Sequence, residues 1–143
     1  MPATIAQKVL ARAAGKPHVA VGQIVTARVD LAMANDFTAP LALKQLQAAG
    51  ATKVFDPAKI CIMAGRHMPF RDIQLATAVE SLRVFCEQQG IEHFYANCEG
   101  MDHALAPELG LIRPGMLIIN ADSHACTAGA LGEIGRASCR ERV

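Results

Sequence analysis

The sequence predicts an α/β fold, in which helices cover both faces of a mainly parallel sheet to give three α/β/α layers. Short apolar segments typical of strands alternate with amphipathic helical segments along most of the chain, and this alternation is the pattern of parallel sheets. The chain has 143 residues, of which 52% are hydrophobic and 19% are charged. This length and composition are sufficient for one domain with its own core.

Three elements are expected in the first part of the chain. Thr4 and Gln7 form a capping box, which predicts the start of a helix. Residues 23–31 predict the first strand, because the segment is rich in β-branched residues. A second helix is expected to begin at Thr38 and to end at Gly50.

The remaining elements follow in chain order. Apolar side chains at helical spacing make the helix that begins at Asp72 the clearest of them, and Gly90 ends it. A packed helix is expected to begin near Gly129. The other expected elements are a strand over 59–63, the helix over 72–89, a strand over 91–95, a short helix over 101–108 and a buried strand over 116–120.

Charge and composition argue against several classes of protein. The chain carries 14 basic and 13 acidic residues without a basic block, so we expect neither a nucleic-acid partner nor a membrane partner. No apolar run reaches the roughly 18 residues of a membrane span, and the first residues lack the pattern of a signal peptide. The five cysteines include no CxxC motif, which favours reduced and mostly buried thiols. We therefore expect a cytoplasmic globular protein.

The end of the chain differs in character from the rest. Residues 135–143 contain three arginines and a cysteine but no amphipathic pattern. We therefore expect a domain over 1–134, followed by an unrelated or artefactual tail over 135–143. A genuine basic C-terminus is the alternative.

Polar residues follow four of the expected strands at their carboxyl ends. Ligands of open α/β folds bind beyond these ends, so we expect the functional site there. Taken singly, each cluster is also compatible with a solvated loop. The clusters are Asn35-Asp36, Arg66-His67, the segment 99–103 and Asp122-Ser123-His124.

The last of these clusters leaves three kinds of site to consider. A hydrolase would need its serine in a G-x-S-x-G turn, and the neighbours of Ser123 do not match that pattern. A metal site needs more ligands than one histidine and one aspartate, and the spacing supplies no obvious set. In a pocket for a carboxylic acid, Ser123 would donate a hydrogen bond and His124 would act as acid or base. Asp122 would then orient His103, with ordinary loop polarity as the alternative.

Three longer segments carry a resemblance to a known family: TIAQKVLARAAG, VDLAMANDFTAP and EGMDHALAPELGLIRPGMLIINADSHACTAGALG. They are similar to the large subunits of 3-isopropylmalate dehydratases, within the aconitase and homoaconitase superfamily. The similarity runs from about Thr4 to Gly132, which is nearly the whole chain before the expected tail.

The resemblance implies a fold, an activity and a cofactor. The fold is the first α/β/α domain of a much larger subunit, and the activity is that of a hydro-lyase acting on small hydroxy di- or tricarboxylic acids. In this family, three cysteines hold an iron–sulfur cluster of the 4Fe–4S type, which binds the substrate as a Lewis acid. A separate small subunit carries a swivelling domain, whose serine removes the carbon-bound proton.

Matched motif by motif, the resemblance also implies the residues of the site. Asp36 and Thr38 are expected to shape a turn and to cap a helix. The implied catalytic residues are His67, His103, Asp122 and His124, and the implied substrate-binding residues are Asn35, Arg66, Ser123 and Thr127.

Position 66 departs from the family pattern. The family has an aspartate before the histidine that His67 matches, and Arg66 stands there instead. Arg66 could bind a substrate carboxylate, because its guanidinium matches one with two hydrogen bonds. Otherwise Asp72 could supply the missing carboxylate, and Arg66→Asp would restore the family's pair.

The cysteines depart from the pattern as well. The family's cluster-ligand motifs are absent, so no residue of this chain is assigned as a metal ligand, Cys126 included. The cluster cysteines are expected downstream of this chain. Cys61 is expected in a buried strand and Cys86 in a helix core, while the role of Cys98 stays open.

The parent protein is therefore predicted to be an iron–sulfur hydro-lyase that isomerises 2- and 3-isopropylmalate in leucine biosynthesis. A homoaconitase-type enzyme of lysine biosynthesis is the nearest alternative. A non-catalytic remnant, or an inactive truncated fragment without the cluster ligands, is the alternative of a different class. This chain alone is expected neither to hold the cluster nor to be active.

Overall fold

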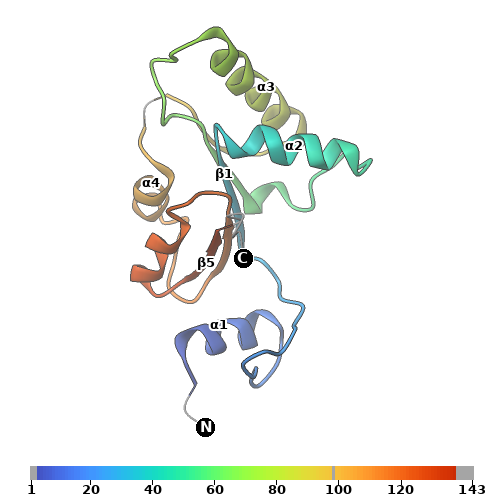
Figure 1. Cartoon of the computed structure of the whole chain (residues 1–143), viewed down its shortest axis with the longest axis vertical. Helices are drawn as coiled ribbons and strands as arrows, with labels where there is room; N and C mark the ends of the chain where they lie inside the picture. The colour runs from blue at the N-terminus through green and yellow to red at the C-terminus, as the bar shows by residue number, and fades with distance from the viewer. Residues whose placement is uncertain (1–2, 98, 138–143) are drawn as a thin grey trace.

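The computed structural model describes residues 3–97 and 99–137 as a parallel sheet flanked by helices (Figure 1). The five strands lie in the order β3-β2-β1-β4-β5, and all neighbouring pairs are parallel. The predicted α/β class with a parallel sheet is thus confirmed. The strands are β1 (Leu31–Asn35), β2 (Ile60–Met63), β3 (His93–Tyr95), β4 (Leu117–Asn120) and β5 (Ile134–Ala137). The helices are α1 (Ile5–Ala13), α2 (Thr38–Ala48), α3 (Ile73–Gln89) and α4 (Asp102–Glu108), with short 3₁₀ helices η1 (Pro57–Lys59) and η2 (Ala125–Leu131).

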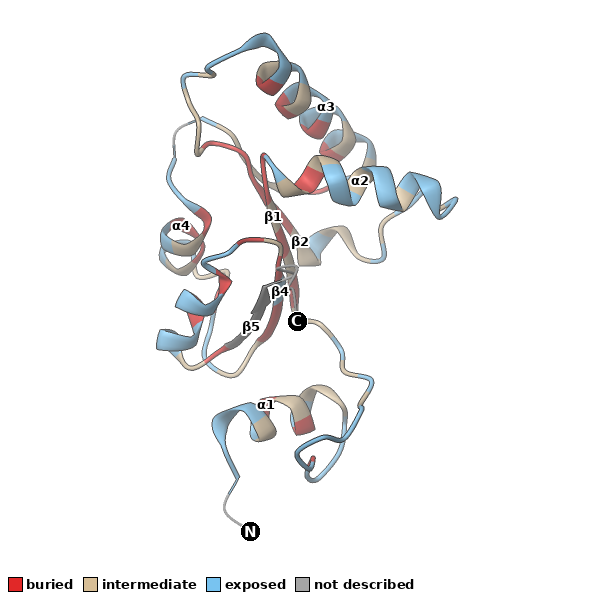
Figure 2. Ribbon diagram, in the orientation of Figure 1, coloured by how far each residue is buried: buried red, intermediate tan, exposed pale blue. Residues whose placement is uncertain are grey.

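Helices cover both faces of the sheet. Side chains alternate between the two faces along each strand, and apolar side chains on both faces pack against helices. Met33 and Cys61 pack in one apolar cluster with residues of α4, whereas Ile62 packs with Leu82 of α3 in another. Figure 1 shows α2 and α3 on one side of the sheet and α4 on the other. Figure 2 shows buried residues concentrated along the strands and on the sides of the helices that meet them. On this face of the sheet, α2 and α3 leave β4 partly uncovered, and the side chain of Ile119 is 43% exposed.

The order of the strands reverses its direction at β1 and β4. The chain moves outward from β1 through β2 to β3, and then returns to place β4 on the other side of β1. The connections that leave β1 and β4 therefore run in opposite directions, and ligands of open α/β sheets bind beyond the carboxyl ends of such a pair of strands. At the other end of β1, Arg12 and Asp30 are 2.7 Å apart and tie α1 to the start of the strand.

Most elements form where the sequence predicts them. Thr4 and Gln7 make the capping box of α1, Asp72 caps α3, and Gly90 ends α3 with a φ of 71°. The expected helix near Gly129 is the 3₁₀ helix η2. The predicted helices and strands that correspond to α2, β2, β3, α4 and β4 are present with shifts of a few residues at their ends.

The first strand lies later in the sequence than predicted. Residues 23–30, all of them described, lie outside any strand, and β1 begins at Leu31. This segment is rich in β-branched residues, but its backbone forms no ladder with a neighbouring strand among the described residues. Ile24 is accordingly 97% exposed. Leu31–Asn35, by contrast, pairs with β2 on one side and β4 on the other. The prediction was wrong because a hydrogen-bonding partner on each side outweighs local β propensity.

The end of the described chain lies in β5, which pairs with β4. The predicted boundary between residues 134 and 135 falls inside this strand, so residues 135–137 of the expected tail pair with β4. Positions 138–143 of the expected tail lie outside the described residues, so the tail stays a prediction. No helix in the described part of the chain combines the length and the apolar character needed to cross a bilayer.

Candidate active site

Polar side chains from the segments that follow β1, β2, β3 and β4 meet beyond the carboxyl ends of the strands. Met33 in β1 is in register with Asn120 in β4, so the residues that follow them lie close together. Asn35 Nδ2 donates a hydrogen bond to Asp122 Oδ1 across this junction at 3.0 Å. The strand ends where the order reverses therefore carry residues that the sequence singled out.

Asn35 is buried and organises the turn into α2. Its Oδ1 accepts hydrogen bonds from the backbone N–H groups of Phe37 and Thr38, each at 3.1 Å. Thr38 shares in this turn, as expected, because its hydroxyl accepts from the Asn35 N–H at 3.1 Å. Both ends of the Asn35 amide thus contact protein, and its contact with a substrate stays a prediction.

His67 pairs with Asp36, a residue that the sequence assigned to the turn. Asp36 Oδ2 lies 2.8 Å from His67 Nδ1, and the Asp36 side chain is fully buried. The Phe37 and His67 rings pack nearly at right angles, with centroids 4.8 Å apart. Asp72, the partner considered from sequence, instead accepts from the Leu75 N–H at 2.8 Å. Asp36 was missed because it reaches His67 only through the pairing of β1 with β2.

Arg66 bridges two buried aspartates. Its Nη2 donates to Asp102 Oδ1 and to Asp122 Oδ1, each at 3.1 Å. The side chains of Asp102 and Asp122 are 1% and 4% exposed, and that of Arg66 is 18% exposed. Its Nε and Nη1 make no hydrogen bond to any residue that the structure describes, so within this part of the chain these two groups keep donors that are not used. Arg66 is therefore first of all a counter-ion of the protein's own aspartates.

Each of these two aspartates also contacts a histidine. Asp102 Oδ1 lies 3.3 Å from His103 Nδ1, and Asp122 Oδ2 lies 3.2 Å from His124 Nδ1. The His103 and His124 rings stack with their centroids 5.2 Å apart. The prediction that Asp122 orients His103 is wrong, because the adjacent Asp102 makes that contact. The Asp-His dipeptide at 102–103 was the sequence signal that could have identified it.

The surroundings of Asp122 favour its ionised form. Burial by itself would raise the pKa of this carboxyl, but the His124 N–H, 2.7 Å from Oδ2, and the Arg66 guanidinium together lower it below its ordinary value. Asp102 accepts a further hydrogen bond from Asn120 Nδ2 at 3.1 Å. Carboxylates held in this way fix the ring orientation of their histidines and leave the outer ring nitrogen for proton transfer.

Ser123 and Thr127 lie at the exposed rim of the same site. Ser123 Oγ is 3.1 Å from His124 Nδ1. Thr127 lies in η2, and its backbone N–H donates to the His124 carbonyl at 2.9 Å. Both residues are accessible from solvent, and their contact with substrate stays a prediction.

The described cysteines do not fit an iron–sulfur cluster. Cys61 and Cys86 are buried in separate apolar clusters, as predicted. Burial raises the pKa of the Cys61 thiol to about 12 and that of the Cys86 thiol to about 11, so neither is disposed to ionise and bind iron. Cys126 is exposed on η2. Cys98 and Cys139 lie outside the described residues.

A different set of ligand-type atoms does come together. His103, Asp122 and His124 each offer one atom, and the three atoms lie within 4.8 Å of one another. No such set was apparent in the sequence, because His103 belongs to α4 and joins the other two only through the fold.

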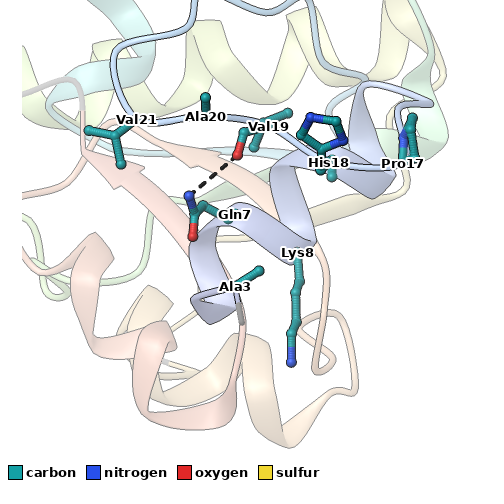
Figure 3. Close-up of a pocket in the computed structure, with 9 residues that line it drawn as sticks. Ala3, Gln7, Lys8, Pro17, His18, Val19, Ala20 and Val21 are labelled. Atoms are coloured by element: carbon teal, nitrogen blue, oxygen red, sulfur yellow. Dashed lines mark hydrogen bonds between the residues drawn. The ribbon is translucent and has the colours of Figure 1, made fainter. Parts of the chain in front are cut away.

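A hollow of about 540 Å³ lies elsewhere, between α1 and the segment that follows it (Figure 3). Gln7 Nε2 donates to the Val19 carbonyl at 3.3 Å across this hollow. Its lining contains Lys8 and His18 but no carboxylate to orient the histidine. We assign it no part in the candidate active site.

Comparison with known proteins adds a family to this geometry. The model of the aconitase family (aconitate hydratase) matches residues 7–138. The 3-isopropylmalate dehydratase large subunit of Aquifex aeolicus is 48% identical over 132 residues, which are 92% of this chain and 31% of that protein. The 3-isopropylmalate dehydratase large subunit 1 of Pyrococcus furiosus is 49% identical over 130 residues, which are 90% of this chain and 31% of that protein. The chain thus spans about a third of the length of the curated relatives it matches.

Proposed function

The chain belongs to the aconitase family, and we propose that its parent protein is an iron–sulfur hydro-lyase that interconverts 2- and 3-isopropylmalate in leucine biosynthesis. The names of the relatives, 3-isopropylmalate dehydratase large subunits, support the choice of substrate. The observation that carries the proposal is the meeting of three histidine–aspartate pairs at one edge of the sheet.

Dehydration and rehydration require groups that gain and lose protons near neutral pH. Histidine is the side chain suited to this task, and a positioned acid or base contributes roughly 100-fold or more to the rate. In this proposal His67, His103 and His124 carry the protons. Each is contacted at Nδ1 by a buried aspartate, which leaves Nε2 as the nitrogen that faces the reaction.

The carboxylates of the substrate require donors that are still available in the site. The Nε–H and Nη1–H groups of Arg66 remain available, and each could donate one hydrogen bond to a substrate carboxylate. The Ser123 and Thr127 hydroxyls are on exposed residues and would be donors for the second carboxylate, while Asn35 would act from behind through its hydrogen bond to Asp122. The arginine would then serve the protein's own aspartates and the substrate at the same time.

The cofactor and the partner subunit are parts of the same proposal. A 4Fe–4S cluster supplies the Lewis acid that makes the substrate hydroxyl a better leaving group. Since the described cysteines do not fit it, its ligands would come from the part of the parent protein that this chain does not span. The large-subunit name of the relatives supports a small subunit, carrying the swivelling domain, as the partner. This chain alone would be inactive.

A chimera tests the proposal directly. Residues 4–132 of this chain would replace the matching third of the Aquifex aeolicus large subunit, assembled anaerobically with that enzyme's small subunit. We expect the chimera to convert 3-isopropylmalate. His124→Gln should lower kcat by about 100-fold, whereas His18→Gln, an exposed position in the segment after α1, should leave kcat unchanged.

Two outcomes would overturn the proposal. A chimera that folds and holds its cluster, yet converts no hydroxy acid, would remove the hydro-lyase assignment. Conversion of homoaconitate without conversion of 3-isopropylmalate would replace the assigned substrate by that of the homoaconitase-type alternative.

A further inference from the structure

We propose that His103, Asp122 and His124 form a binding site for a single borderline divalent cation, with Zn²⁺ as the probe ion. Their three ligand atoms lie within 4.8 Å of one another. Zn²⁺ holds nitrogen and oxygen ligands at about 2.0–2.2 Å, so the atoms of a tetrahedral site are about 3.4 Å apart. Small side-chain rotations close this gap, and the His124 side chain, which is 60% exposed, is free to make them.

The residues around the three ligands already have the arrangement that metal-binding histidines need. Metal-bound imidazoles usually have their second nitrogen held by a carboxylate, which fixes the ring and its tautomer. Asp102 stands in this position for His103, with its Oδ1 3.3 Å from Nδ1, so Nε2 is left for a cation. Asp102 is itself held by Asn120 and by Arg66. The orientation of the His103 ring is therefore fixed before any metal binds.

The other two ligands are tied to each other. The backbone N–H of His124 donates to Asp122 Oδ2 at 2.7 Å, which keeps the carboxylate and the imidazole on one side of the loop. Asn35 and Arg66 both donate to the other oxygen, Oδ1. A cation would then approach Oδ2 and take the place of the His124 ring contact, while the carboxylate stays anchored through Oδ1.

Charge and access also suit a dication. With neutral imidazoles, the two aspartates and the guanidinium of Arg66 sum to one negative charge beside the ligands. The side chains of His103 and His124 are 25% and 60% exposed, so the site opens to solvent. Two histidines and one carboxylate leave coordination positions for water or for an oxygen ligand, which is the form of catalytic rather than structural metal sites.

The inference does not depend on the proposed hydro-lyase activity, because binding alone tests it on this chain. The experiment titrates the chelator-treated 143-residue protein with ZnCl₂ in a calorimeter, and with CoCl₂ while the visible d–d bands are recorded. We expect one ion per chain and tetrahedral or five-coordinate Co²⁺ bands. His103→Gln and His124→Gln should each weaken binding by about 100-fold, with circular dichroism to confirm that the variants are folded.

Two control variants separate this site from other ligands. Cys126→Ser removes the exposed thiol nearest to His124 in sequence, and His18→Gln removes a remote histidine. Both should keep the affinity of the unmodified chain. Absence of stoichiometric binding, an affinity unaffected by His124→Gln, or a loss of affinity in Cys126→Ser would each overturn the three-residue site.

Discussion

Replacement of Arg66 by methionine tests the electrostatic centre of the candidate site. Methionine keeps much of the apolar stem but removes the charge between Asp102 and Asp122. The two carboxylates would remain buried without their cation, because their side chains are only 1% and 4% exposed. We therefore expect a marked loss of stability rather than a local change at the surface.

The magnitude follows from the distances. At an effective dielectric constant of about 20, each 3.1 Å contact carries roughly 5 kcal/mol of Coulomb energy before desolvation is subtracted. In practice, removal of one partner from a buried ion pair costs about 3–5 kcal/mol. The two aspartates keep hydrogen bonds from Asn120 and Asn35, so we expect the lower end, about 3 kcal/mol at pH 7.

The loss should depend on pH in a defined direction. The pKa of Asp122 in the folded protein lies below its ordinary value. The stability that this carboxylate contributes is therefore present above the unfolded pKa of about 4, and it is lost as the pH falls through the folded pKa. Without Arg66 that contribution shrinks. The difference between the variant and the unmodified chain is thus full at pH 7 and decreases below about pH 4.

Urea unfolding followed by circular dichroism measures this difference, and Arg83→Met is the matched control. Arg83 also contacts two carboxylates, Glu80 and Glu87, but on the exposed surface of α3. Its removal should change stability little, because solvent screens both contacts. If Arg66→Met costs no more than Arg83→Met at pH 7, the reasoning from the buried bridge is refuted.

The same geometry argues against one of the two expectations for Arg66→Asp, the restoration of an Asp-His pair. The sequence pattern suggested that this change would restore a partner for His67, but His67 already contacts Asp36 at 2.8 Å. A third carboxylate would instead join Asp102 and Asp122. We expect Arg66→Asp to be less stable than Arg66→Met in the same urea experiment.

Three further predictions concern the stability contributed by Glu133, the binding of substrate by Ser123 and the cofactor content of the chain. Burial raises the pKa of Glu133 to about 7 from 4.5, and neither carboxylate oxygen has a partner among the described residues. Stability should therefore fall by roughly 3 kcal/mol as the pH rises from below 4.5 to above 7, and thermal melts of Glu133→Gln should show most of that fall removed. In the chimera, Ser123→Ala should raise KM for 3-isopropylmalate about 10-fold with little change in kcat. The reason is that a carboxylate contact that is equally strong in the ground state and the transition state affects KM alone. An unchanged KM would exclude Ser123 from the substrate site. Anaerobic reconstitution of the 143-residue chain with iron and sulfide should give no cluster absorbance, and stoichiometric bound iron with such a spectrum would show that the ligand assignment is wrong.

The elements predicted correctly are those whose signals are complete within a short stretch of sequence. The α3 helix has its cap at Asp72, its stop at Gly90 and its buried side chains at helical spacing between them. The capping box at Thr4 and Gln7 is equally local. The first strand was misplaced because its position depends on β2 and β4, which supply the hydrogen bonds on both sides of Leu31–Asn35.

The sequence by itself determined the chemistry of the candidate site: which histidines, aspartates and hydroxyl groups follow the strands, and that they lie at one edge of a parallel sheet. Only the tertiary structure decided which of these groups meet. It pairs Asp36 with His67, gives His103 to Asp102 rather than Asp122, and places Arg66 between two aspartates. The physical reason is that the Asp36–His67 contact and the Arg66 bridge join the ends of different elements, whereas Asp102 and His103 are adjacent in sequence. The return of β4 to the side of β1 is set by burial of the whole sheet, not by any local pattern.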